Sequence, residues 1–217
     1  ADILGETVGL RTLVDEGGGS GKVKPSAVNR EWMLDESRDG MLRPLGGKLT
    51  SARIEAALTL DRALALLEKP HIPSLTDKKL LIWCHRDAKE LQGDRETGRS
   101  LGLDPEVVEH LLRRFGRCSR DIFSAIQKDS TLSRRLEPEL PFIAAELVHA
   151  AQKEMAMDLE DVLRRRVPLL LLSRHKREIL KDTLELLSPL WGWGEAQGQS
   201  ELEEVLRKVA STFVKKA

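Results

Sequence analysis

The sequence predicts a mainly α protein in which a C-terminal helical bundle follows a few strands and one helix. Apolar residues recur at helical spacing throughout residues 101–217, and prolines and capping residues separate the successive apolar stripes. Strand-like runs occur only before residue 46. We therefore expect three parts: residues 1–69, a linker of residues 70–100, and an all-α domain of residues 101–217.

Short strands and loops make up the start of the chain. Thr7–Val14 and Arg30–Asp35 have strand-like patterns, Glu36–Gly40 is a polar turn, and Met41–Leu45 is the third strand. These strands are too few to close a sheet of their own, so we expect them to complete a sheet begun upstream in a longer protein.

One helix is predicted over Thr50–Lys69, because apolar residues recur at helical spacing until Pro70 ends the run. Residues 70–100 contain several helix-breaking residues around a single apolar island, Leu80–Trp83. The helix breakers are Pro70, Pro73, Gly93 and Gly98. This pattern predicts a linker with one ordered patch.

About five or six helices are predicted in residues 101–217 from usual helix lengths. Asp104 is an N-cap before Pro105, and Gly116 ends this first helix of the domain. Pro141 begins a helix with a buried apolar stripe. That stripe consists of Ile143, Leu147, Val148, Ala151 and Met155.

Three more helices follow. Asp158 caps the next one, and Pro168 terminates it. A further helix is stopped by Pro189. Ser200 with Glu203 forms a capping box at the start of the last helix.

Two conspicuous clusters in this region have ordinary structural explanations. Acidic residues such as Glu160 and Asp161 are interleaved with Arg164–Arg166, which favours salt bridges over a basic binding patch. Trp191 and Trp193 flank a glycine and are expected to fill the gap between the last two helices. A surface anchor to lipid is the alternative for these tryptophans.

Composition excludes several classes of protein. Basic and acidic residues balance at 35 each, so no overall field attracts nucleic acid or acidic lipid. Cys84 and Cys118 have no CxxC spacing, which argues against a disulfide framework and a zinc site and fits a reduced cytosol. No apolar run approaches the roughly 20 residues that span a bilayer. No metal site is expected.

The segment best suited to chemistry is Gly46-Gly47-Lys48-Leu49-Thr50, which connects the third strand to the helix. Paired glycines at a helix start bring backbone N–H groups, the positive helix end and the lysine ammonium to one point, and this suits an anionic group. The alternative is an ordinary strand-to-helix turn with a solvated lysine.

Three segments follow one another along the chain: Gly9-Leu10-Arg11, Asn29-Arg30-Glu31-Trp32 and Gly46–Arg53. Together they resemble the closing segment of the flavin domain in FAD-dependent glycerol-3-phosphate dehydrogenases. A second block is similar to the helical C-terminal domain of the same family. It comprises Glu154-Met155-Ala156 and Leu159–Arg166. Two separate blocks in the correct order extend the resemblance over most of the chain.

The dinucleotide-binding pattern of such an enzyme, Gly-x-Gly-x-x-Gly between a strand and a helix, does not occur in this sequence. We therefore expect the chain to be a C-terminal fragment, with residues 1–69 as the tail of the FAD and substrate domain. Such a fragment is expected to bind no FAD and to be inactive alone.

The resemblance implies roles for seven residues. Lys48 would be catalytic, and Arg11 and Arg30 would bind the substrate phosphate, for which a guanidinium offers bidentate contacts. A solvated or salt-bridged arginine is the alternative at both positions. The residues beside the flavin would be Gly46, Gly47, Lys48, Leu49 and Thr50.

The implied reaction is oxidation of sn-glycerol 3-phosphate to dihydroxyacetone phosphate, with FAD as hydride acceptor and a quinone as electron acceptor. The general base, a histidine, would lie upstream. Family members are peripheral proteins at the inner face of a membrane, so a cytoplasmic location with peripheral contact is expected.

Two alternatives remain at the level of sequence. Thr12 stands where the family usually has a proline, and Ser51-Ala52-Arg53 replaces Thr-Tyr-Arg, so a related FAD-dependent glycerol-3-phosphate oxidase is one alternative. The other is a non-catalytic helical interaction module. Such a module has no use for a Gly-Gly-Lys turn and two strand arginines.

Overall fold

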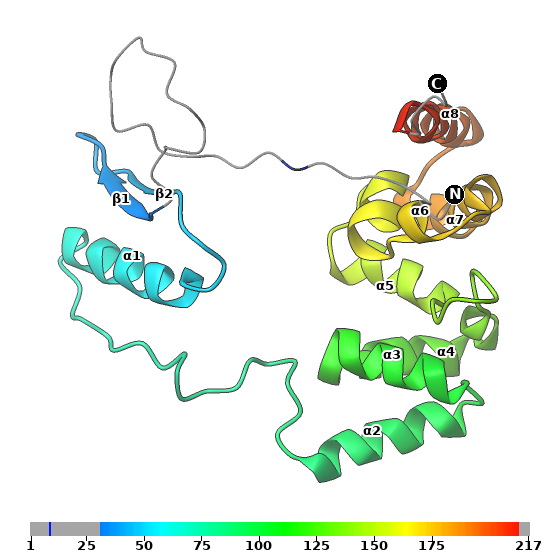
Figure 1. The fold of residues 1–217 in the computed structure, drawn as a ribbon, viewed down its shortest axis with the longest axis horizontal. Coiled ribbons are helices and arrows are strands. Elements are labelled where there is room, and N and C mark those ends of the chain that lie inside the picture. Colours follow the sequence, from blue (N-terminus) through cyan, green and yellow to red (C-terminus); the bar gives the residue numbers. More distant parts are fainter. Residues whose placement is uncertain (1–8, 10–30, 213–217) are drawn as a thin grey trace. The chain divides into compact units, whose positions relative to one another are not determined.

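A computed structural model describes Gly9 and residues 31–212 of the chain (Figure 1). The described residues fall into two compact units, an N-terminal unit within Val8–Leu81 and a helical unit that begins at Ile82. Apart from Gly9, the strand predicted over Thr7–Val14 lies outside the described residues.

The N-terminal unit contains an antiparallel hairpin. Strand β1, Met33–Glu36, pairs with β2, Leu42–Leu45, so that Met33 lies opposite Leu45 and Glu36 opposite Leu42. The polar turn between them closes with a hydrogen bond from the Gly40 N–H to the Ser37 carbonyl, and Gly40 has a φ of 82°. The two predicted strands and the turn between them are confirmed.

Helix α1, Ala52–Leu66, follows the hairpin and contacts β2. None of its residues is buried by the described part of the chain, and its apolar side chains are largely open to solvent, with Ile54 54% and Leu60 57% exposed. A two-stranded hairpin and one helix are too little structure to enclose a core.

The helical unit consists of α-helices joined by short 3-10 and π segments, which confirms the mainly α prediction. In chain order they are α2 (Ala88–Ser100), α3 (Pro105–Phe115), η2 (Gly116–Cys118), α4 (Ser119–Lys128), η3 (Ser130–Ser133), α5 (Ala144–Lys153), the π-helix η4 (Asp161–Arg166), α6 (Leu169–Leu172), α7 (Lys176–Trp191) and α8 (Glu195–Thr212).

Helix α5 is the centre of this unit, because it contacts both α4 and α7 and contributes to two apolar clusters (Figure 1). Ala144 and Ala145 at its start pack with residues of α3 and α4, while Leu147 and Ala150 pack with the later helices. The first cluster includes Val108, Leu111, Ile122 and Phe123; the second includes Leu159, Leu163, Leu180, Leu187, Leu202 and Val205.

The predicted linker is wrong over its second half, where α2 forms. This helix has almost no apolar residues, so hydrophobic periodicity could not reveal it. It docks through Gly98, where an added Cβ would lie 2.9 Å from a Val108 methyl group, and through Asp94, which accepts hydrogen bonds from Arg120.

Glu90 adds a second electrostatic attachment of α2. Hydrogen bonds from the backbone and side chain of Arg86 lower the pKa of its carboxyl group to about 2, and Arg117 and Arg120 both lie within ion-pair distance of it. Charge pairing therefore adds to the packing of Gly98 and Leu91 in holding this helix.

Two predicted features around α3 and α5 differ in the structure. Asp104 precedes α3 but its carboxylate makes no cap hydrogen bond, because it pairs with Arg135 instead. Met155, expected in a buried stripe, is 81% exposed with a φ of 55°. Helix α5 ends before Met155, at Lys153. The Ala156 N–H donates a hydrogen bond to the Ala150 carbonyl, and this places Ala156 in the core.

The last two helices are longer than predicted. Helix α7 continues past Pro189, which lacks one N–H donor, as far as Trp191, and Gly192 caps its end with a φ of 68°. Helix α8 begins at Glu195, so Ser200 is an interior residue and the predicted capping box at that position is wrong.

Leu147→Ala is expected to lower the free energy of unfolding by about 2 to 5 kcal/mol, because the side chain is fully buried in the second cluster. Urea denaturation followed by circular dichroism measures the change. Leu172→Ala, at a side chain 43% exposed, is the control and should cost less. A loss below about 0.5 kcal/mol for Leu147→Ala would contradict its core position.

Candidate functional site

The Gly-Gly-Lys turn lies between the end of β2 at Leu45 and the start of α1 at Ala52. Gly46 and Gly47 have φ values of 72° and 91°, which side-chain-bearing residues rarely adopt. The two glycines therefore reverse the chain direction tightly and present the backbone of Lys48 near the helix start.

The carboxylate of Glu55, in the first turn of α1, lies against this turn. Its Oε1 accepts hydrogen bonds from the Lys48 N–H at 3.5 Å and from Ser51 Oγ at 2.5 Å. A Cβ added to Gly47 would lie 2.5 Å from Glu55 Oε2, so that flexible side chain would have to move, and the φ of 91° disfavours any residue but glycine there. The donors at the helix start thus converge on a carboxylate oxygen, the chemistry that an anionic ligand atom requires.

A pocket of about 380 Å³ opens beside the turn, with Gly46, Glu55 and Trp32 among its lining residues. The other lining residues are Pro44, Ala52, Ala56 and Thr59. The indole Nε1 of Trp32 is buried and has no hydrogen-bond partner in the described part of the chain. This donor and the glycine turn line one hollow of the N-terminal unit.

The predicted site residues are only partly brought together. Gly46 lines the pocket, whereas Lys48, Leu49 and Thr50 are exposed, Leu49 to 95%. Arg11 and Arg30 lie outside the described residues. Sequence reasoning missed Glu55, for which the only signal was an acidic residue in the first turn of a helix.

The helical unit holds a second polar cluster, formed by Glu137, Ser173 and His175. The buried Glu137 carboxylate accepts a hydrogen bond from Ser173 Oγ and lies 2.9 Å from His175 Nδ1, and the His175 N–H donates to Ser173 Oγ at 2.8 Å. These bonds join the segment before α5 to the segment before α7, at the edge of a cavity of about 560 Å³.

Both titratable groups of this cluster are shifted. The hydrogen bond from Ser173 lowers the pKa of Glu137, with a smaller contribution from His175. The hydrogen bond to Glu137 in turn raises the pKa of His175. Glu137 and His175 are therefore both ionised over a wider pH range than two unpaired side chains would be.

Two secondary expectations from the sequence are tested by the described residues. The arginine run is paired as expected, with Arg164 bound to Glu160 and Arg165 to Asp161. The indole of Trp191 packs against the second cluster and donates to the Ala156 carbonyl at 3.1 Å, a structural role.

Within residues 31–212, no helix is long and apolar enough to cross a membrane. No group of three or more metal-ligating side chains of the kind His, Cys, Asp or Glu occurs in that described part.

These features define a helical domain that follows a glycine turn suited to an anionic ligand atom. A family model, the C-terminal domain of alpha-glycerophosphate oxidase, matches residues 78–198, more than half of the chain. The chain belongs to this family, which confirms the resemblance read from its two sequence blocks.

Curated relatives match the chain over nearly its whole length. Glycerol-3-phosphate dehydrogenase 2 of Mycobacterium tuberculosis is 28% identical over 100% of this chain and 37% of the relative. The probable mitochondrial glycerol-3-phosphate dehydrogenase of Caenorhabditis elegans is 26% identical over 98% of this chain and 29% of the relative. The chain thus spans 37% and 29% of the length of these two relatives.

Solved structures with a similar fold are also found. The glycerol-3-phosphate dehydrogenase from Bacillus halodurans, crystallised in complex with FAD, superposes with a TM-score of 0.67 at 20% identity. The match covers 85% of this chain and 39% of that one.

The Glu137 cluster should contribute most to stability in a defined pH window. Glu137 has a lowered folded pKa, so its contribution is present above the unfolded value of 4.5 and is lost as pH falls through the folded pKa. His175 has a raised folded pKa, so its contribution is present below 6.5 and is lost as pH rises through the folded value.

Glu137→Gln should therefore lower the melting temperature most between about pH 4.5 and 6.5, with a smaller effect in stronger acid. Thermal unfolding measured from pH 3 to pH 9 tests this expectation. Glu185→Gln removes an exposed carboxylate of α7 and is the control. A pH-independent effect of Glu137→Gln would contradict the role of the ionised pair.

Proposed function

We propose that this chain forms part of a flavoprotein that oxidises sn-glycerol 3-phosphate to dihydroxyacetone phosphate. The observation that carries the proposal is the extent of the similarity to glycerol-3-phosphate dehydrogenases. It includes the Gly-Gly-Lys turn as well as the helical domain, because the matches run over the whole chain.

FAD is the cofactor in this proposal, and the chemistry of the turn fits one edge of it. Backbone and hydroxyl donors of the turn already meet the oxygen of a carboxylate, which shows that they can bind an anionic oxygen. The residues that would hold the cofactor are Gly46, Gly47, Lys48, Leu49 and Thr50. FAD, when bound, would supply the hydride acceptor.

The residues of this chain would then act by position and charge. The Lys48 ammonium and the positive start of α1 would favour negative charge at the turn. Because Glu55 shares these donors, its carboxylate would have to withdraw from the turn for a second anion to bind there. Arg11 and Arg30 would bind the substrate phosphate through bidentate contacts.

A quinone is the proposed electron acceptor, and a cytoplasmic location with peripheral contact at the inner membrane face follows from it, because quinones reside in the bilayer. A related oxidase that uses oxygen is the second candidate, favoured by the name of the matching family model. A non-catalytic helical module is disfavoured, because the relatives match the N-terminal unit as well.

The longer protein that contains this chain should be yellow when purified, and sn-glycerol 3-phosphate added without oxygen should bleach its flavin absorbance. The 217-residue chain is the control and should retain no flavin after gel filtration, because its sequence has no Gly-x-Gly-x-x-Gly motif. A colourless longer protein would overturn the proposal.

The same preparation distinguishes the two electron acceptors. After reduction, rapid reoxidation by a soluble quinone without hydrogen peroxide is expected of a dehydrogenase. Production of hydrogen peroxide with oxygen, at a rate similar to that with the quinone, would assign an oxidase.

Lys48→Met in the longer protein should slow flavin reduction by roughly 10²- to 10³-fold, the loss expected for one preorganised charged donor. Lys48→Arg should restore the rate only in part, because a planar guanidinium differs in shape from a compact ammonium. Stopped-flow reduction by sn-glycerol 3-phosphate measures both, with the exposed Lys69→Met as control. A wild-type rate in Lys48→Met would make the lysine a solvated turn residue.

A further inference from the structure

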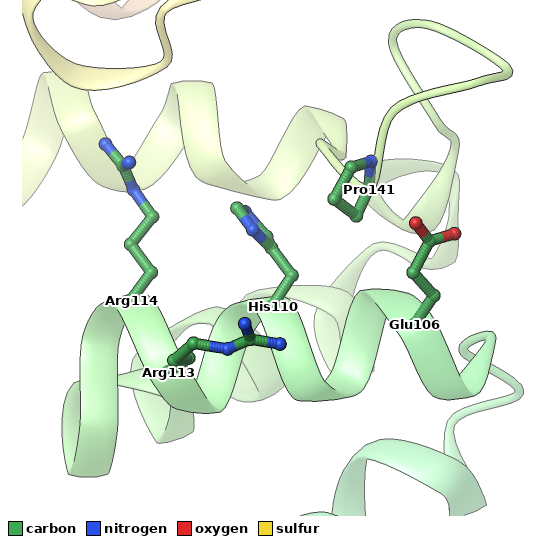
Figure 2. Close-up of a pocket in the computed structure, with 5 residues that line it drawn as sticks. All are labelled: Glu106, His110, Arg113, Arg114 and Pro141. Carbon is green, nitrogen blue, oxygen red and sulfur yellow. The ribbon is translucent and has the colours of Figure 1, made fainter.

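A pocket of about 440 Å³ in the helical unit has basic side chains on one wall (Figure 2). Its lining residues are Glu106, His110, Arg113 and Arg114 of α3, together with Pro141 from the segment before α5. This pocket shares no residue with the Gly46–Thr50 turn and has no part in the proposed flavin chemistry.

The ring of His110 is held in place by two neighbouring side chains. Its Nε2 lies 2.9 Å from Oε2 of Glu146, and its ring meets that of Phe142 edge-on, with centroids 4.7 Å apart. Glu146 is fully buried, and its other oxygen accepts the Ile143 N–H at 3.0 Å. A buried carboxylate held in this way gives the pocket a rigid wall.

The Arg114 side chain lies at the same wall of the pocket. Its Nε lies 3.9 Å from Glu146 Oε2, and its guanidinium makes no hydrogen bond to another residue within the described part of the chain. Figure 2 shows Arg114 and His110 rising from the same side of α3, with Arg113 on the adjoining side.

The acidic residues at this pocket already have partners. Glu106, on its rim, pairs with Arg135 at 3.1 Å. Glu109, on the same helix but outside the pocket lining, is bound by Arg95, and the hydrogen bond from Arg95 lowers its pKa. Arg113 itself is exposed and makes no ion pair with a residue in the described part of the chain. Its guanidinium is therefore available to a ligand.

We propose that this pocket binds a small phosphate-bearing anion through the guanidinium groups of Arg113 and Arg114, against the fixed wall of His110. A phosphate group has oxygens on several sides, so two neighbouring arginines can each donate hydrogen bonds to it. The pocket volume lies within the range of small-molecule sites and leaves room for a short ester group.

Isothermal titration of the full chain at low salt tests the proposal with two probes, inorganic phosphate and sn-glycerol 3-phosphate. Saturable binding is expected for at least one of them. Arg113→Gln should weaken it about tenfold, the loss of one charge-assisted contact, and Arg113→Gln with Arg114→Gln should abolish it. Arg113 is exposed, so its variant should fold, whereas Arg114 also faces the buried Glu146 carboxylate, so circular dichroism has to confirm that the double variant is folded before its binding is compared.

Arg177→Gln is the matched control, because Arg177 is exposed, lies on α7 and does not line the pocket. Three results would overturn the proposal: no binding of any phosphate probe, equal affinity in the wild-type chain and the double variant, or an equal loss in the control. Malonate is the carboxylate probe, and tighter binding of malonate than of either phosphate would contradict the assignment to phosphate.

The source of the phosphate is distinguished by a third probe, vesicles that contain phosphatidic acid. Binding of the soluble probes alone supports a free phosphate ester. Binding of the vesicles alone, lost in the double variant but not in Arg177→Gln, assigns the same phosphate chemistry to a lipid headgroup.

Discussion

The buried carboxylate of Glu146 determines how the helical unit is assembled. Removing an ionised carboxylate from water is costly unless its oxygens are hydrogen-bonded and its charge is compensated. Here one oxygen accepts the Ile143 N–H at the start of α5, and the other faces His110 and Arg114 of α3. Satisfying that one group therefore fixes α5 against α3, and α5 in turn supplies residues to both apolar clusters.

Where apolar periodicity is strong, the sequence was sufficient to predict the fold. Helix α3 begins and ends as its proline and glycine indicate, and the two strands of the hairpin lie where alternating residues place them. Helix α2 could not be predicted in this way, because its attachment depends on a close backbone approach at Gly98 and on charges contributed by α4. Neither feature produces a periodic pattern that can be recognised in a single sequence.

The candidate site was predictable to a smaller extent. The paired glycines indicated a tight turn at a helix start, and their φ values agree with that interpretation. The contact of Glu55 with the turn depends on how α1 is oriented, which spacing alone does not determine. The pocket on α3 was missed for a similar reason, since its basic wall depends on a carboxylate 36 residues away in the sequence.

The junction between the start of the helical unit and η2 is made by backbone atoms. The Trp83 carbonyl accepts the Arg117 N–H at 2.8 Å and lies where a Cβ of residue 116 would stand, only 2.0 Å from that position. The side chains of Ile82 and Trp83 remain 80% and 48% exposed. Mutational tolerance at this junction is consequently asymmetric: the contact uses the backbone carbonyl of residue 83 and not its side chain, whereas residue 116 has to remain a glycine.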